Sequence, residues 1–421
     1  MVRVKRAPKI SKFLAAFGPG IIAGAADDDP SGIATYSIAG AQLGTMLLWT
    51  AWITWPLMAS VQMMCARIGM VTGQGLVATM KLKVPRPILV FLCLGLLAAN
   101  TFNIAADLSA MADAAALLTG WRPHGFLILF AGVISWATVK LPYGTISRVL
   151  KWLVFVLFSY VIVAFLIGPN WSVVFHDTFF PPFPRGKEAW ATLVAILGTT
   201  ISPYLFFWQA AQEVEEEKGR GRNTLKKRMG ATSAEILWRK VDVGVGTLFS
   251  NLVMFFIILS TALTLHNHGI THLETTAQVA QALRPLAGNF AMLLYTLGLL
   301  SVGFLAIPTL TGSAAYALSE AFSWRQGLNL KLKKAPAFYG VILLSTLAAV
   351  LLDFLNINPV KALFWSAVVN GLLAPVILVV ILLVASDPVL MNGQPSSIMG
   401  RVGVGITTLL MFGAAIGMFF L

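Results

Sequence analysis

Charged side chains are scarce in this chain: they make up 11% of its 421 residues, against 57% hydrophobic residues. An ordinary soluble domain carries about 25% charged residues, so the composition argues against a water-soluble globular protein. Cysteine is nearly absent, and Cys65 and Cys93 both lie in or beside apolar runs. Two such cysteines support neither a disulfide framework nor a cysteine-rich metal site. The N-terminus lacks the small-residue cleavage site of a signal peptide, so we expect the first apolar run to be retained.

Apolar runs of about 20 residues, long enough to cross a bilayer, follow one another from end to end. They predict an all-α membrane protein that has the lipid bilayer as its surroundings. No polar stretch is long enough to fold as a separate soluble domain. We expect eleven spans, at residues 13–42, 45–67, 87–117, 124–140, 149–168, 188–212, 241–265, 287–319, 336–353, 359–385 and 400–420.

The formal net charge of +13 at pH 7 has a topological explanation, so no nucleic-acid partner is expected. With the N-terminus in the cytoplasm, 25 of the 30 Lys and Arg residues fall on the cytoplasmic side, which is the positive-inside distribution. It predicts a cytoplasmic tail at 1–12, an external loop at 169–187, and a connector with an eleventh helix and an external C-terminus at 386–421. The longest polar segment, residues 212–240, is expected to be a solvated cytoplasmic connector.

Three consecutive carboxylates, Asp27, Asp28 and Asp29, interrupt the first expected span, FGPGIIAGAADDDPSGIATYSIAGAQLG. An acidic side chain at the centre of a spanning helix costs about 3 kcal/mol on insertion scales, unless it faces water, a partner or an ion. Pro30 and Gly32 follow, and a helix broken by proline frees backbone carbonyls that are tolerated where they line a cavity. Carboxylates beside free carbonyls offer the hard oxygen ligands that Mg²⁺, Ca²⁺ and Mn²⁺ accept. The structural alternative is that the aspartates cap a helix end at the membrane surface.

The sixth expected span has a second interruption in LVAILGTTISPYLFFWQAAQEVEEE, at Thr199, Ser202 and Pro203. A single proline in a membrane helix is usually a kink, but this break comes five spans after the first. An odd number of spans per repeat inverts the second copy, and interrupted helices at matching positions of two inverted halves indicate a transporter's central site. We therefore expect one five-helix repeat at 13–168 and a second at 188–385, with the two breaks facing each other.

At these motifs the sequence resembles the NRAMP family of divalent-metal transporters, and more closely its NRAMP-related magnesium transporter branch. The resemblance covers nearly the whole chain, with GPG before the first break, DPSG at it, ADL in the third span and GTTISPY in the sixth. It implies a LeuT-type fold with a 5+5 inverted repeat, discontinuous helices 1 and 6, and an extra eleventh helix. It also implies a transporter that works by alternating access, rather than an enzyme, and that needs no cofactor beyond the transported cation.

In typical members of the family, the metal ligands come from a DPGN motif and an A-x-x-M-P-H motif. Asp29 matches the first motif, with Asp28 as a further carboxylate beside it, whereas Gly32 stands where Asn is usual. Thr199 occupies the place of the alanine, whose backbone carbonyl is the ligand, and Ser202 replaces the methionine. Thioether sulfur favours softer metals, whereas carboxylate, carbonyl and water suit Mg²⁺ and Mn²⁺. Because Mg²⁺ usually keeps several waters, we expect partly hydrated Mg²⁺ as the substrate, with Mn²⁺ also accepted.

The residues expected to carry protons in this family are altered as well. Tyr204 replaces the histidine of the second motif, and Ala110 stands where the glutamate of a third-span acidic pair is expected, although Asp107 matches the first acid. Tyrosine has an ordinary pKa near 10 and is a poor proton shuttle. We therefore expect weak or no proton coupling, with Asp27 and Asp28 as residues that would restore a proton path.

Two asparagines are further candidates for the ion path. Asn103 lies four residues before Asp107, on the same helical face, and Asn370 lies in the tenth span as a candidate secondary ligand. The alternative is that they form hydrogen bonds between packed helices.

These observations favour a secondary importer of Mg²⁺ and Mn²⁺ in a bacterial inner membrane, with no obligate protein partner. A proton-coupled Mn²⁺/Fe²⁺ transporter of the typical NRAMP kind is the alternative, and a LeuT-type carrier of a small organic solute is a weaker one. A passive channel is also compatible with broken helices. A prenyltransferase would need a second Asp-rich motif with nearby basic residues, which the sixth span does not supply.

Overall fold

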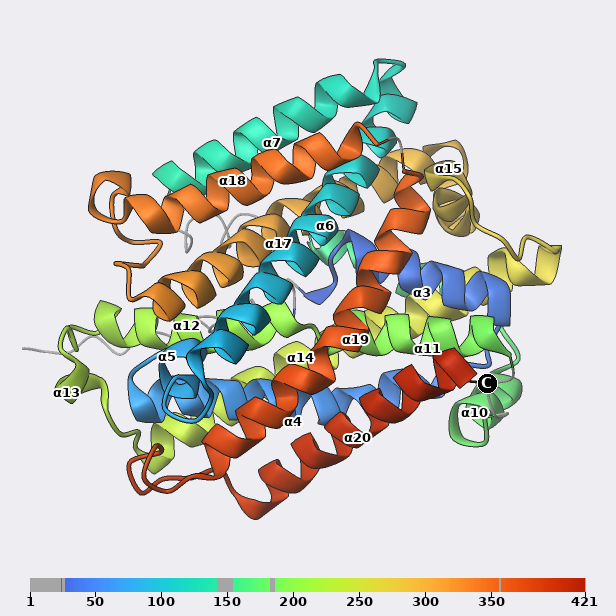
Figure 1. The fold of residues 1–421 in the computed structure, drawn as a ribbon. Coiled ribbons are helices and arrows are strands. Elements are labelled where there is room, and N and C mark those ends of the chain that lie inside the picture. Colours follow the sequence, from blue (N-terminus) through green and yellow to red (C-terminus); the bar gives the residue numbers. More distant parts are fainter. Residues whose placement is uncertain (1–23, 25–26, 142–153, 182–185, 356, 421) are drawn as a thin grey trace, which may run out of the picture.

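The computed structural model describes residues 24, 27–141, 154–181, 186–355 and 357–420 (Figure 1). Within these ranges the chain is built from helices, and no β-strand occurs. The α-helices are α3 (Pro30–Leu43), α4 (Trp49–Thr72), α5 (Leu76–Met80), α6 (Arg86–Thr119), α7 (Pro123–Lys140), α9 (Phe158–Ile167), α10 (Trp171–Phe179), α11 (Lys187–Thr200), α12 (Pro203–Gly219), α13 (Leu225–Arg228), α14 (Ser233–Thr264), α15 (Thr276–Ala280), α16 (Arg284–Ala287), α17 (Ala291–Phe322), α18 (Pro336–Asp353), α19 (Pro359–Ser386) and α20 (Ile398–Phe420). Short 3₁₀ turns are η1 (Val154–Leu157), η2 (His266–His268), η3 (Gln281–Leu283), η4 (Gly288–Phe290) and η5 (Leu332–Lys334).

Eight helical segments of the described chain are long and apolar enough to cross a membrane. The other three expected spans correspond to shorter or more polar helices. α3 has 14 residues and α9 has 10, and parts of both expected spans lie outside the described residues. α4 has 24 residues but buries the polar side chains of Thr50, Thr54 and Gln62. The helices thus follow the expected order of spans, which is that of an all-helical membrane protein.

The first span is interrupted at its aspartates, as the sequence predicts. Gly24 and Asp27 are helical, the helix is lost at Asp28 and Asp29, and α3 begins at Pro30. Proline suits this first helical position because it lacks the N–H that would have no partner there. Asp29 is the residue that caps the new helix: its carboxylate accepts a hydrogen bond from the Gly32 N–H.

The sixth span is interrupted in the same way. α11 ends at Thr200, residues Ile201 and Ser202 are not helical, and α12 begins at Pro203. In Figure 1, α11 and α12 follow one another through the middle of the molecule. Both discontinuous helices of the predicted fold are therefore present.

Several helices pack around the two breaks. α3 packs against α6, α11, α14 and α19, and α11 packs closely on α19. The last contact depends on two glycines: a Cβ added to Gly198 would lie 2.0 Å from the carbonyl oxygen of Ala367, and one on Gly371 would lie 2.4 Å from that of Val194. At the edges of the bundle, α7 lies beside α18, and α20 packs against α19, α11 and α4 (Figure 1).

The expectation of a solvated connector at residues 212–240 is only partly right: residues 219–238 are mostly exposed, but Glu213, Glu215 and Glu217 are buried. α12 continues to Gly219, and α14 begins at Ser233, eight residues before the expected span. A capping box starts α14, in which the Thr232 side chain accepts from the Glu235 N–H and the Glu235 carboxylate accepts from the Thr232 N–H. Only the short segment between these helices, which includes α13, remains as a connector.

Arg239 is the centre of a buried ion-pair cluster that joins the ends of α12 and α14. Its side chain is 8% exposed, and its Nε lies 2.7 Å from Glu213 Oε1 and its Nη1 lies 2.6 Å from Asp242 Oδ2. Its Nη2 pairs with Glu216. Gln209, one helical turn before Glu213, donates to the same Glu213 oxygen at 2.7 Å. Carboxylates that looked solvated in sequence are thus held by a guanidinium from the next span.

Candidate metal site

The carboxylate of Asp29 lies at the start of α3 and is 2% exposed. Its Oδ1 accepts from the Gly32 N–H at 2.8 Å and from the Ser31 hydroxyl at 2.9 Å. Its Oδ2 accepts from Asn103 Nδ2 at 3.1 Å. A side-chain oxygen at the N-cap satisfies a free backbone donor, and the positive end of the helix dipole stabilises its negative charge. The local sequence DPSG therefore fixes a buried carboxylate at the first break.

Asn103 of α6 connects the first break to two other helices. Its Nδ2 donates to Asp29 and also to Asp107 Oδ2, at 3.0 Å. Its Oδ1 accepts from Asn370 Nδ2 of α19 at 3.2 Å and, more weakly, from the Ser31 hydroxyl at 3.4 Å. One amide therefore positions two carboxylates from different helices. Asp107 Oδ1 and Asn370 Oδ1 are buried and have no hydrogen-bond partner in the part of the chain that the structure describes.

The two breaks meet at Gly32 and Thr199. A Cβ added to Gly32 would lie 3.1 Å from Thr199 Oγ1, so the start of α3 and the end of α11 are in contact. At the second break the Ser202 hydroxyl donates to the carbonyl oxygens of Thr199 at 2.7 Å and Gly198 at 2.9 Å. The Thr199 carbonyl is thus already engaged by Ser202, which leaves its second lone pair for another partner.

Asp27 and Asp28 turn toward a different helix. Asp27 Oδ2 lies 2.8 Å from the hydroxyl oxygen of Ser250 on α14, and Asp28 Oδ1 lies 3.1 Å from the same atom. All three residues are fully buried. One hydroxyl proton serves two carboxylates here, and Asp27 Oδ1 and Asp28 Oδ2 lack a partner among the described residues. The three aspartates therefore divide, with Asp29 toward α6 and the other two toward α14.

The residues singled out in the sequence are brought together, but not as a cluster of carboxylates. Within the described ranges, no three His, Cys, Asp or Glu side chains converge in an arrangement that could hold a metal. Any cation bound here would therefore take part of its ligands from carbonyl, hydroxyl or amide groups, or from water. Tyr204 is buried at the start of α12, within electrostatic range of Asp29, Asp27 and Asp107.

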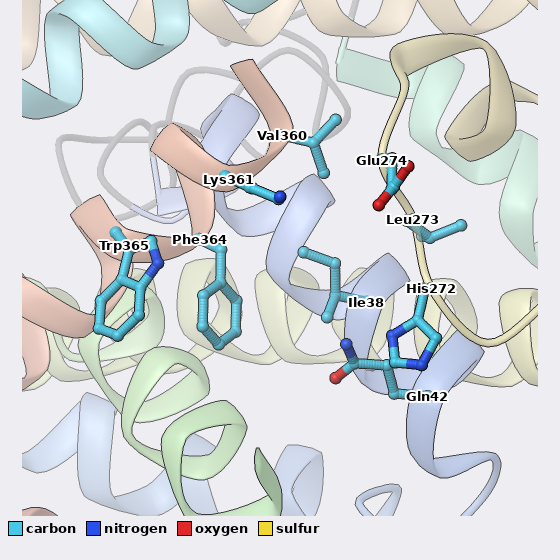
Figure 2. A pocket seen from close by; sticks show the side chains of 9 residues that line it. All are labelled: Ile38, Gln42, His272, Leu273, Glu274, Val360, Lys361, Phe364 and Trp365. Atoms are coloured by element: carbon cyan, nitrogen blue, oxygen red, sulfur yellow. The ribbon is translucent and has the colours of Figure 1, made fainter. Parts of the chain in front are cut away.

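A cavity of about 240 Å³ lies beside α3 and the start of α19, with Ile38, Gln42, His272, Leu273, Glu274, Val360, Lys361, Phe364 and Trp365 around it. Figure 2 shows the side chains of Glu274 and Lys361 approaching it from opposite sides, with Gln42 and His272 also among the polar side chains that line it. Ile38 and Gln42 belong to α3. Ile38 follows Ser31 by seven residues and Gln42 follows Ile38 by four, so all three lie on the same face of the helix. The cavity thus lies over the face of α3 that leads to the first break.

Sequence reasoning missed two contributors to the site. Ser31, the third residue of the DPSG motif, was given no role, yet its hydroxyl donates to Asp29. Ser250 is a polar residue within the apolar run TLFSNLVMFF. Polar residues at membrane depth usually have a partner, so this signal was present, but its partner is 222 and 223 residues away in the chain.

Comparison with known proteins identifies the family of this chain. Residues 20–421 match the family model described as natural resistance-associated macrophage protein-like. A divalent metal cation transporter MntH of Caldanaerobacter subterraneus is 26% identical, over 96% of this chain and 92% of its own length. The MntH of Aeromonas hydrophila is 24% identical over 93% of both chains.

Solved structures support the fold. A manganese transporter of Eremococcus coleocola superposes with a TM-score of 0.76 at 17% identity, covering 99% of this chain and 90% of its own. A nucleobase-cation-symport-1 family transporter gives a TM-score of 0.58 at 14% identity, covering 96% of this chain and 92% of its own. The LeuT-type fold expected from the sequence is confirmed. The chain therefore belongs to the natural resistance-associated macrophage protein-like (Nramp) family, whose members are secondary metal transporters rather than enzymes.

Proposed function

We propose that this protein imports divalent cations, Mg²⁺ and Mn²⁺, by alternating access around the two helix breaks, with weak or no proton coupling. The ion is held by the Asp29 carboxylate, the Thr199 carbonyl and the Ser202 hydroxyl, with the Gly32 backbone beside them. Asp28, which lies against Ser250 in this structure, would have to turn toward the ion to join them. The observation that carries the proposal is the contact between the two breaks: a Cβ added to Gly32 would lie 3.1 Å from Thr199 Oγ1. Helix ends that meet deep in a membrane protein supply oxygen ligands for ions.

The chemistry of the donors supports hard dications. Carboxylate, carbonyl and hydroxyl oxygens surround the contact, and Ser202 stands where a thioether would favour softer metals. Curated relatives are named divalent metal cation transporters, and one relative of known structure is named a manganese transporter. Mn²⁺ is therefore the best supported substrate. The preference for Mg²⁺ rests on the donor set alone.

Weak proton coupling is inferred from the residues around Asp107. Asp107 bonds to Asn103, and no second acid follows at Ala110. Tyr204 stands in the place of a histidine, which is the side chain that titrates most readily near neutral pH. A proton-coupled Mn²⁺/Fe²⁺ transporter of the typical kind is the alternative, and internal pH distinguishes the two.

The topology is also part of the proposal. We place the protein in a bacterial inner membrane with a cytoplasmic N-terminus and an external C-terminus, and assign the repeats to residues 13–168 and 188–385. In this orientation the cavity shown in Figure 2 is the external approach to α3.

The decisive experiment is uptake of Mg²⁺ and Mn²⁺ into proteoliposomes with internal pH recorded at the same time. We expect uptake of both ions without acidification. Asp29→Asn should abolish uptake, because it removes the negative charge while keeping a side chain of nearly the same shape. Asp387→Asn is the matched control, since that carboxylate pairs with Lys83 in a loop outside the site. Acidification in proportion to metal uptake would contradict weak proton coupling. Uptake that survives Asp29→Asn would show that Asp29 is not an essential ligand of the ion.

A second comparison tests selectivity. Ser202→Met adds a sulfur ligand, and Ser202→Ala only removes the hydroxyl. Competition by Cd²⁺ against Mn²⁺ uptake should strengthen in Ser202→Met and stay unchanged in Ser202→Ala. The same competition in both variants would show that residue 202 does not contact the ion.

A further inference from the structure

A cavity of about 450 Å³ lies where three helices of the bundle end. Ile167, the last residue of α9, and Thr264, the last residue of α14, line it together with residues of η2, η3 and α16. α17, which begins at Ala291, packs against η3 and α16. The segments that contain α14 and α17 are long and apolar enough to cross a membrane. The cavity therefore lies at the level where membrane helices leave the hydrocarbon region.

The polar side chains of this cavity are basic or neutral. Arg284, His268 and Gln281 line it, and no Asp or Glu of the described chain does. Among the described residues, none of these three side chains makes a hydrogen bond or an ion pair. All 17 Asp and Glu residues of the chain lie within the described ranges, so Arg284 has no carboxylate side chain as its counter-ion. It is also the only Lys or Arg between Lys240 and Arg325.

Apolar side chains surround these polar groups. The wall of the cavity includes Leu263 and Ile270. Next to it, Leu166 near the end of α9 and Phe290 just before α17 are exposed. Exposed apolar side chains on membrane helices face lipid, and basic side chains at the ends of such helices reach the headgroup layer. Arg284 is therefore placed at the level of lipid phosphates.

We propose that this cavity binds the phosphate of an anionic membrane phospholipid, with Arg284 and His268 against the phosphate and the apolar wall against the start of an acyl chain. A guanidinium donates two parallel hydrogen bonds to phosphate oxygens, which makes arginine well suited to this group. Within the described residues no carboxylate lines the cavity to receive the ammonium group of a zwitterionic headgroup, so an anionic lipid is favoured. This lipid site is independent of the transported metal and goes beyond the proposed function.

The segment that carries His268 also contacts the broken first helix. His266, two residues earlier in η2, donates from Nδ1 to the carbonyl oxygen of Ala41 at 2.8 Å, in the last turns of α3. At its other end, α3 begins beside Asp29. A lipid that holds η2 and α16 in place should therefore stabilise the folded bundle, and a ligand that binds only the folded state raises Tm.

The test measures the Tm of the purified full-length chain in an uncharged detergent while dioleoylphosphatidylglycerol is added, and takes an apparent Kd from the rise in Tm. We expect Arg284→Gln to weaken this apparent Kd by roughly tenfold or more, as for the loss of a charge-assisted hydrogen bond. Because Arg284 is exposed and makes no ion pair among the described residues, the substitution should leave the Tm without lipid nearly unchanged.

Lys361→Gln is the matched control variant. Lys361 is likewise exposed, lines a cavity and makes no ion pair among the described residues, but its cavity is the one beside α3 and α19. Its apparent Kd for the lipid should match that of the wild type. Two further compounds separate the parts of the lipid: dioleoylglycerol has the same chains without phosphate, and glycerol 3-phosphate has the phosphate without chains. Neither should raise Tm as dioleoylphosphatidylglycerol does.

Four outcomes overturn the lipid site. The first is no rise in Tm with dioleoylphosphatidylglycerol, or an equal apparent Kd in the wild type and Arg284→Gln. The second is an equal weakening in Lys361→Gln, which would show only a general attraction between a basic protein and anionic lipid. The third is an equal rise with dioleoylglycerol, which would show that the phosphate is not recognised. The fourth is an equal rise with glycerol 3-phosphate, which would show a site for soluble phosphate compounds.

Discussion

Replacing Arg239 by methionine tests whether the cluster between α12 and α14 is an integral part of the fold. The guanidinium pairs with Glu213, Glu216 and Asp242, and the side chains of Glu213 and Asp242 are 2% and 6% exposed. Removing one partner of a buried ion pair costs about 3–5 kcal/mol, because the remaining charge is left without compensation. At an unfolding entropy of about 2.1 cal/mol/K per residue, a chain of 421 residues should lose roughly 3–6 °C in Tm.

The matched control is Arg222→Met, which removes a guanidinium that is 34% exposed and pairs with Glu217 and Glu235. A hydrogen bond to Glu217 is the largest cause that raises the pKa of Arg222. Arg222 is partly exposed to water, and Glu217 keeps Arg220 as a second partner, so the loss should be about 0–1 kcal/mol, as for solvent-exposed pairs. We expect its Tm to fall by about 1 °C or less in a thermal unfolding assay in detergent. Adding Glu213→Gln to Arg239→Met should recover part of the loss, because a neutral amide needs no counter-ion. An Arg239→Met shift no larger than that of Arg222→Met would refute the reasoning.

Two further variants test the site and the packing around it. Asn103→Leu should lower kcat/KM for Mn²⁺ uptake by roughly tenfold or more, because Asp29 and Asp107 each lose a hydrogen bond to a charged group, worth about 1.5–3 kcal/mol; unchanged kinetics would show that the amide does not position them. Gly198→Ala should lower Tm strongly or prevent folding, because its Cβ would clash with the backbone of α19. The control is Gly132→Ala on α7, where a Cβ meets no atom within 4 Å, and it should leave Tm nearly unchanged. Equal Tm values in the two variants would contradict the close contact between α11 and α19.

The helix breaks could be predicted from the sequence because their causes are local. Pro30 and Pro203 remove backbone donors, and the aspartates that precede Pro30 are too costly for a continuous span. Both breaks lie at the expected residues. Apolar length likewise gave the order of the spans, since it depends only on neighbouring residues.

The partners within the site could not be predicted, because they depend on how separate spans pack. Nothing in the sequence near Asp27 indicates that its oxygen meets Ser250, and the role of Asn103 as a bridge between Asp29 and Asp107 requires the position of α6 relative to α3. Periodicity says which residues share a face of one helix, but not which helix that face meets.

The burial of the glutamates at the start of residues 212–240 was missed for a different reason. The run of glutamates was read by composition as solvated, whereas Arg239 and the arginines at 220 and 222 neutralise it in the folded chain. The start of α14 could have been predicted from the sequence, because Thr232 and Glu235 have the spacing of a capping box before an apolar run. Hydropathy alone placed this helix start too late.

The hydrogen bond from Ser202 to the Thr199 carbonyl has a consequence for the return half of the transport cycle. A carrier that delivers its cargo must reorient unloaded, and a bare carbonyl at the centre of the protein would make that step costly. The Ser202 hydroxyl gives this oxygen a partner from within the chain. For the ion site proposed above, this hydroxyl would take the place of the cargo at the Thr199 carbonyl, which would lower the energy of the unloaded state and favour rapid resetting over tight retention of the ion.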